Sequence, residues 1–136
     1  MINKKRIFFI ADDDQDDKEL FINALQQIDE HFTYITASDG EEALKKLLDI
    51  TFQLPEIIFL DLNMPKINGK QCLIKIKENK TLQDIPVIMY STTADKKEME
   101  EINQLGAAFF LQKPNRFDEL CNALEKIVNV KWNVVL

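Results

Sequence analysis

The sequence predicts an α/β fold in which helices cover both faces of a parallel sheet. Short apolar runs alternate with longer amphipathic stretches along the 136 residues. Four of these runs, residues 7–11, 57–60, 87–90 and 107–111, are too continuous for strands with one face in water, which is typical of buried parallel strands. Hydrophobic residues make up 46% of the chain and charged residues 29%, a composition that indicates a packed globule. We expect residues 1–136 to form one domain with a short apolar tail at 130–136.

Each predicted strand is followed by a stretch whose apolar residues recur at helical spacing. A fifth strand, at 33–37, alternates more than the others, so we expect it near an edge of the sheet. Ser38 and Asp39 are candidate N-caps of the second helix, and Gly106 is a candidate stop after the fourth. In chain order, the apolar positions of the five helices are Leu20, Phe21, Ala24, Leu25 and Ile28; Ala43, Leu44, Leu47 and Leu48; Leu73 and Ile76; Met99, Ile102 and Leu105; and Phe117, Leu120, Cys121, Leu124, Ile127 and Val128.

Charge and composition argue against several classes of protein. The chain has 17 Lys and Arg against 23 Asp and Glu, a formal net charge of -6, so direct binding of nucleic acid is not expected. The apolar run at 7–11 is too short for a signal peptide or a membrane span, which predicts a cytoplasmic protein without membrane contact. His31 is the only histidine, which makes a zinc site or a Ser-His-Asp triad hard to build.

Polar residues follow four of the predicted strands at the edge where an open parallel sheet binds its ligands. Asp12 and Asp13 follow the first strand, the third strand ends at Asp61, the fourth ends at Ser91 and Thr92, and Lys113-Pro114 follow the fifth. Carboxylates gathered this closely call for a hard divalent cation, and oxygen donors completed by water and phosphate suit Mg²⁺. A lysine and a hydroxyl beside them suit phosphoryl oxygens, so this set favours phosphoryl transfer with an aspartate as nucleophile.

Asp61 ends a buried strand and begins the turn Asp61-Leu62-Asn63-Met64-Pro65, and here the chain resembles a known family. It is similar to the receiver domains of two-component response regulators, including the stand-alone chemotaxis type, from residue 6 to about residue 128. That family has an acidic pair after the first strand, a phosphoacceptor aspartate that ends the third, a Ser or Thr that ends the fourth, and a Lys-Pro pair after the fifth. The matching residues are Asp12 and Asp13, Asp61, Ser91, and Lys113-Pro114.

The resemblance implies a phosphoacceptor signalling domain rather than an enzyme. Its fold would be flavodoxin-like, a doubly wound sheet of order 2-1-3-4-5, with a cis Lys113–Pro114 bond. Asp61 would accept a phosphoryl group from a histidine kinase or histidine phosphotransfer protein, and Lys113 would contact that group. Mg²⁺ would be bound by Asp13, Asp61 and the backbone carbonyl of Asn63, with Asp12 acting through water.

The resemblance also implies how a signal leaves the site. Ser91 would be the switch hydroxyl that moves toward the phosphate, and Phe110 would be the aromatic switch that enters the vacated space. This would change the face of the fourth helix, fifth strand and fifth helix, which would bind a downstream protein. Asn63 and Thr93 occupy positions that tune autodephosphorylation in the family. The chain departs from the pattern in three ways: Phe110 replaces Tyr or His, Asn68 replaces an Asp before Gly, and no output domain follows the fifth helix.

Other interpretations stay open at this point. One is a haloacid-dehalogenase-like phosphatase with Asp12 and Asp14 as its acidic pair, and another is a scaffold with this fold that acts without phosphorylation. Asp14, Asp16 and Asp17 are expected to be a solvated acidic loop that caps the first helix. The charged positions of the fourth helix fit a solvated face as well as a partner surface. The tail at 130–136 either packs on the domain or forms an exposed apolar patch.

Overall fold

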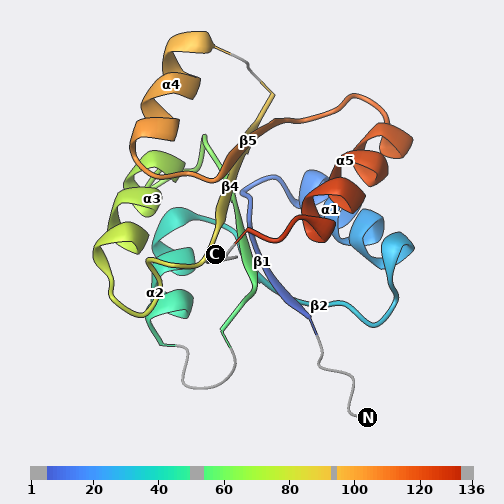
Figure 1. Ribbon diagram of the computed structural model, residues 1–136, viewed down its shortest axis with the longest axis horizontal. Coiled ribbons are helices and arrows are strands. Elements are labelled where there is room, and N and C mark those ends of the chain that lie inside the picture. Colours follow the sequence, from blue (N-terminus) through green and yellow to red (C-terminus); the bar gives the residue numbers. More distant parts are fainter. Residues whose placement is uncertain (1–5, 50–53, 93–94, 133–136) are drawn as a thin grey trace.

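The computed structural model describes residues 6–49, 54–92 and 95–132, and it confirms a parallel sheet between two layers of helices (Figure 1). The strands are β1 (Ile7–Ala11), β2 (Thr33–Ala37), β3 (Ile57–Asp61), β4 (Val87–Ser91) and β5 (Phe109–Gln112). The helices are α1 (Gln15–Ile28), α2 (Gly40–Leu48), α3 (Gly69–Glu78), α4 (Lys96–Gln104) and α5 (Phe117–Asn129).

The order of the strands is β2-β1-β3-β4-β5, and every neighbouring pair is parallel. This is the doubly wound order that the resemblance implied. It places β2 at one edge, as its alternating pattern predicted, and β3 in the centre. The chain reverses its direction of winding after β2, so the carboxyl ends of β1 and β3 lie side by side at the switch point where such sheets bind ligands.

The alternation of side chains along each strand divides the core into two clusters, one on each face of the sheet. On one face, Phe8 and Ile10 of β1 pack with Phe59 of β3 and with apolar residues of α1 and α5. On the other face, Phe9 and Ala11 pack with residues of α2, α3 and α4. Figure 1 shows the same division, with α1 and α5 on one side of the sheet and α2, α3 and α4 on the other.

The prediction that residues 107–111 form a strand buried on both faces is wrong in part. The strand is Phe109–Gln112, and Phe109 is 47% exposed. The physical reason is that β5 is the second edge of the sheet, where the helices cover only part of each face. Leu111 is buried and Phe110 is partly buried, so the apolar run in the sequence reflects partial burial at an edge.

The predicted helix boundaries are confirmed by the caps at the starts of α2 and α3 and by the backbone conformation after α4. The side chain of Asp39 accepts from the backbone N–H of Glu42 at the start of α2. Asn68 and Gln71 form a reciprocal capping box at the start of α3, so the Asn that departs from the family pattern opens this helix well. Gly106 has φ 105°, a left-handed conformation that glycine adopts without strain, and it follows the end of α4.

The beginning of the apolar tail packs on the domain. The rings of Trp132 and Phe109 have centroids 6.3 Å apart, and the Trp132 indole N–H donates to the carbonyl of Ile127 at 3.0 Å. Val134, Val135 and Leu136 lie outside the described residues. None of the helices in the described part of the chain combines the length and the apolar character needed to cross a bilayer.

The first turn of α2 lies against the loop between β3 and α3, and this approach requires glycine at position 40. A Cβ atom on Gly40 would overlap the carbonyl oxygen of Ile67. The carbonyl of Gly40 also accepts a hydrogen bond from the thiol of Cys72 at 3.5 Å. The first contact places α2 directly beside the loop that follows Asp61, and the second places it beside α3.

We therefore expect Gly40→Ala to destabilise the fold by about 2–3 kcal/mol, because the added methyl meets rigid backbone. Urea unfolding monitored by circular dichroism measures this as a lower midpoint with an unchanged slope. Glu41→Ala, at the next and exposed position of the same helical turn, is the control and should change stability by no more than about 0.5 kcal/mol. Equal midpoints for the Gly40 variant and the parent would contradict this account.

Candidate functional site

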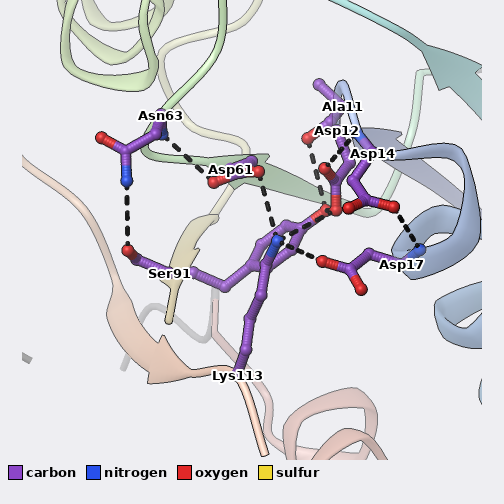
Figure 2. Close-up of polar contacts among 9 residues, drawn as sticks. Ala11, Asp12, Asp14, Asp17, Asp61, Asn63, Ser91 and Lys113 are labelled. Carbon is purple, nitrogen blue, oxygen red and sulfur yellow. Dashed lines mark hydrogen bonds and ion pairs between the residues drawn. The ribbon is translucent and has the colours of Figure 1, made fainter. Parts of the chain in front are cut away.

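The register of the strands brings the predicted site residues together. Ala11 of β1 pairs with Leu60 of β3, so Asp12 and Asp61 are the next residues on two adjacent strands. Ser91 of β4 pairs with Gln112 of β5, and Lys113 is the next residue. The carboxyl ends of four strands therefore supply the acids, the hydroxyl and the ammonium that the sequence predicted there (Figure 2).

Asp12 is a completely buried carboxylate, and all its contacts are with the protein. Its Oδ1 accepts from the backbone N–H of Asp14 at 2.9 Å. Its Oδ2 accepts from the hydroxyl of Tyr90 at 2.9 Å and from the ammonium of Lys113 at 3.2 Å. A buried carboxylate needs such partners because it has lost its hydration.

Lys113 is the cationic centre of the site. Its Nζ donates to Oδ2 of Asp12 at 3.2 Å, of Asp17 at 3.0 Å and of Asp61 at 3.2 Å, so three carboxylates use its three N–H donors (Figure 2). Burial lowers the pKa of Lys113, but the charges of Asp61, Asp12 and Asp17 outweigh burial and raise the pKa above its ordinary value. The lysine is therefore charged throughout the physiological range.

Asp61 is buried, with 5% of its surface exposed, and its charged form is unfavourable in the metal-free protein. Burial and the nearby Asp12 carboxylate raise the pKa of Asp61 to about 7, against the opposing effects of Lys113 and of the backbone N–H of Asn63. The pocket thus carries more negative charge than one ammonium balances. An additional cation at this position would remove the imbalance.

The donor atoms fit a hard divalent ion. One carboxylate oxygen from each of Asp12, Asp13 and Asp61 lies within 4.8 Å of the others, and Asp13 is exposed to solvent whereas the other two are buried. All three ligands are oxygens, which Mg²⁺ and similar hard cations prefer and which zinc or copper sites seldom use alone. The exposed Asp13 marks the side from which the pocket meets water.

Ser91 and Asn63 lie beside this acidic pocket. Ser91 is completely buried, and the side-chain amide of Asn63 donates to its hydroxyl at 3.5 Å. Phe110 is paired with Met89 across the β4–β5 ladder and packs against the same core cluster as Met89. Because side chains alternate along β4, Ser91 and Met89 share a face, so Phe110 and Ser91 are on the same side of the sheet. Thr93 lies outside the described residues.

Two expectations about polar loops need correction. Asp17 does more than solvate the loop, because its partly exposed carboxylate contacts Lys113, whereas Asp14 caps α1 by accepting from the backbone N–H of Asp17. The expectation of a cis Lys113–Pro114 bond is also wrong, since no peptide bond among the described residues is cis. The trans isomer is favoured by about 0.5–1 kcal/mol before proline, and the ion pairs of Lys113 form with it.

Sequence reasoning missed Tyr90 and Asp17. The alternation of side chains along the strands could have predicted the position of Tyr90. Ile88 of β4 and Phe59 of β3 pack in the same cluster, and the residues two positions further along these strands, Tyr90 and Asp61, point to the same face. Burial raises the pKa of Tyr90, with a further contribution from Asp12, so its phenol keeps its proton. Asp17 lies in the first turn of α1, and only the packing of α1 against the sheet brings it to Lys113.

The fold and the site define a class of phosphoacceptor signalling domains, and comparison with known proteins identifies the family. Residues 8–125 match the response regulator receiver domain, so the chain belongs to this family. Receiver domains take phosphoryl groups from histidine kinases or phosphotransfer proteins in two-component systems.

Individual relatives agree with this assignment. Protein PilG of Pseudomonas aeruginosa is 36% identical over 91 residues, which is 67% of this chain and 65% of PilG, so the match spans less than two thirds of that relative. The crystal structure of the phosphorylated cyanobacterial phytochrome response regulator RcpA has a TM-score of 0.84 at 27% identity and covers 91% of each chain. The chemotaxis response regulator CheY4 of Vibrio cholerae has a TM-score of 0.77 at 25% identity, covering 91% of this chain and 99% of CheY4. The two solved structures are response regulators, and none of the three matches supports a phosphatase of the haloacid-dehalogenase type.

The raised pKa of Asp61 predicts how stability depends on pH in the absence of metal. Between the ordinary value of 3.8 and about 7, the folded protein binds a proton on Asp61 that the unfolded chain releases, so the free energy of unfolding falls as the pH rises. Asp61→Asn removes this effect. We expect the variant to be more stable than the parent by on the order of 3 kcal/mol at pH 8, with the gain vanishing toward pH 4.

Urea unfolding of both proteins across this pH range, in the presence of a chelator, measures the difference. Asp16→Asn, an exposed acid on α1, is the control and should show no such trend. A stability gain for Asp61→Asn that is constant from pH 4 to pH 8 would refute the raised pKa.

Proposed function

We propose that Asp61 accepts a phosphoryl group from the phosphohistidine of a histidine kinase or histidine phosphotransfer protein, and that the modification alters a protein-binding face. The observation that carries this proposal is the pocket itself. A lysine ammonium lies 3.2 Å from the Asp61 carboxylate, within a group of three acids at the carboxyl ends of β1 and β3. Such an arrangement suits a reaction in which positioning and neutralisation of charge supply most of the catalysis.

In the transfer step, a carboxylate oxygen of Asp61 attacks phosphorus and forms a P–O bond while the P–N bond to the partner's histidine breaks. The electron pair of the broken bond returns to the imidazole nitrogen, which takes up a proton from solvent. The product is an acyl phosphate on Asp61. Lys113 is close enough to Asp61 to neutralise a phosphoryl oxygen, and the Ser91 hydroxyl offers a neutral donor for another.

Asp12, Asp13, Asp61 and the backbone carbonyl of Asn63 would hold Mg²⁺, consistent with the oxygen-only donor set. When bound, Mg²⁺ supplies positive charge that offsets the charge of the phosphoryl oxygens. The imbalance of charge around Asp61 supports this assignment, because two buried carboxylates share one ammonium there.

The output of the domain would be a change in the face formed by α4, β5 and α5. Ser91 would move toward the phosphate, and Phe110, on the same side of the sheet, would fill the space it leaves. A shift of this kind needs a free-energy difference of a few kcal/mol between two conformations. A downstream protein is the expected partner of this face, and the net charge of -6 argues against nucleic acid.

Phosphorylation can be tested with a small phosphoryl donor. Incubation with phosphoramidate and Mg²⁺ is expected to add one phosphoryl group, detected by mass spectrometry of the intact protein. Asp61→Asn removes the nucleophilic carboxylate and should abolish labelling, whereas the control Asp16→Asn should be labelled like the parent. Persistent labelling of the Asp61 variant would overturn the assignment of the phosphoacceptor.

Metal binding has its own test, in the thermal stability of the unmodified protein. Mg²⁺ that binds only the folded state stabilises it by about 2.7 kcal/mol at 100 times its dissociation constant. We expect the midpoint temperature of unfolding to rise with Mg²⁺ in the parent and in Asp16→Asn, and to rise far less in Asp13→Asn. An equal rise in the Asp13 variant would exclude Asp13 as a ligand.

A further inference from the structure

Tyr90 is a buried tyrosine on β4, directly before Ser91 and 2% exposed. It packs in the core cluster that faces α1 and α5, together with Ile88 of β4 and Phe59 of β3. An apolar residue would fill this position without a polar atom to satisfy. A tyrosine at the same place brings a hydroxyl group into the core, and a buried hydroxyl requires a partner.

The partner of the hydroxyl is the acidic pocket. It lies 2.9 Å from Oδ2 of Asp12 and 3.3 Å from the carbonyl oxygen of Ala11. A phenol has a single hydrogen, and the shorter contact to the charged acceptor is the stronger bond. The ring of Tyr90 also lies beneath Lys113, with the ammonium nitrogen 4.9 Å from the ring centroid. One side chain thus contacts both the buried acid and the cation that faces it.

Three donors hold the Asp12 carboxylate, and they differ in how they respond to chemistry at Asp61. The backbone N–H of Asp14 holds Oδ1, while Tyr90 and Lys113 share Oδ2. Lys113 also serves Asp61 and is proposed above to contact the phosphoryl group, so its bond to Asp12 is the one open to exchange. Tyr90 is neutral and fixed in the core. Its hydroxyl would therefore keep its hydrogen bond to Asp12 when the Lys113 ammonium donates to a phosphoryl oxygen instead.

We propose that Tyr90 is a positioning residue of the phosphorylation site, whose hydroxyl holds the Asp12 carboxylate in the orientation in which it serves the metal. The inference rests on the proposed function, because it assigns Asp12 to a Mg²⁺ site. Donors behind a ligand fix its orientation, and the loss of one such donor typically weakens metal binding about 10- to 100-fold. Tyr90 would act through Asp12 and would touch neither the metal nor the phosphoryl group.

The chain offers a matched pair of variants for the test. Tyr90→Phe removes the hydroxyl and keeps the ring beneath Lys113, whereas Tyr34→Phe removes the hydroxyl of the only other tyrosine, which is 39% exposed on β2. Isothermal titration of the metal-free proteins with Mg²⁺ gives the dissociation constants. We expect Tyr90→Phe to bind Mg²⁺ at least about tenfold more weakly than the parent, and Tyr34→Phe to bind like the parent.

A spectroscopic readout does not require the Tyr90 variant to fold. Tyr34→Phe retains Tyr90 as its only tyrosine, and binding of Mg²⁺ beside Asp12 should change the hydrogen bond of the Tyr90 phenol. We expect a near-ultraviolet tyrosine difference spectrum that saturates with Mg²⁺ in the parent and in Tyr34→Phe. The same spectrum should be absent in Tyr90→Phe. If Tyr90 has a purely structural role, Tyr90→Phe changes unfolding by urea but binds Mg²⁺ like the parent, and Tyr34→Phe shows no tyrosine spectrum that depends on Mg²⁺.

The outcomes separate this inference from the proposed function. Equal Mg²⁺ affinity of Tyr90→Phe and the parent overturns the role of Tyr90 while Mg²⁺ binding by the parent still stands. A missing tyrosine signal in a Tyr34→Phe protein that binds Mg²⁺ overturns it as well. Absence of Mg²⁺ binding in the parent overturns the metal site and this inference together. Weaker binding in Tyr90→Phe alone, with the difference spectrum lost, supports the inference.

Discussion

Asp12 and Asp61 are buried carboxylates at the ends of adjacent strands. The ion pairs that the Lys113 ammonium forms with both are the interaction that stabilises them in this buried position. The register of β1 and β3 fixes the two acids side by side, so their repulsion cannot be relieved by a change of rotamer alone. Removing one partner from a buried ion pair typically costs about 3–5 kcal/mol, because the remaining charge has neither water nor a counter-charge. Lys113 contacts both acids from β5, and it therefore couples the two halves of the sheet through charge.

The same constraint leaves the charge of the pocket unbalanced. Two buried carboxylates share one lysine, so the pocket keeps excess negative charge. Burial also leaves the Asp61 carboxylate poorly solvated, with 5% of its surface exposed. The sheet also places two groups of site residues on opposite faces. Asp12, Tyr90 and Lys113 continue the strand faces that pack on α1 and α5, while Ser91 and Phe110 belong to the opposite face.

Much of this arrangement can be predicted from the sequence because it depends on local signals. Four apolar runs mark strands, and the polar residues that follow them mark the edge where ligands bind, so Asp12, Asp61, Ser91 and Lys113 can be placed from their spacing. The prediction that Asp61 ends the third strand and Ser91 the fourth is confirmed, because β3 and β4 end at these residues. The order of the strands came from the resemblance to receiver domains, because a run of apolar residues does not say which neighbour it pairs with.

Long-range packing decides what the sequence could not predict. Asp17 resembles its exposed neighbours on the first turn of α1, and only the packing of that helix against the sheet brings its carboxylate to 3.0 Å from the Lys113 ammonium. Tyr90 stands inside an apolar run and so was counted as core, although its hydroxyl reaches a carboxylate from another strand. Phe109 was expected to be buried because its neighbours in sequence are apolar, but its exposure follows from the position of β5 at the edge of the sheet.

Arg6 and Trp132, which bound the described chain, meet at the amino ends of the strands. They line one cavity of about 390 Å³ together with Glu56 and Pro86, the residues that precede β3 and β4, and Arg6 also donates to the carbonyl of Val128 at 2.6 Å. The described part of the chain thus begins and ends beside one cavity, on the rim opposite the acids. A reporter or a second module inserted next to Arg6 or Trp132 would extend from that rim and leave the approach to Asp61 open. Because Arg6 and Trp132 line the same cavity, a short linker that joins them would give a circularly permuted protein with its site intact.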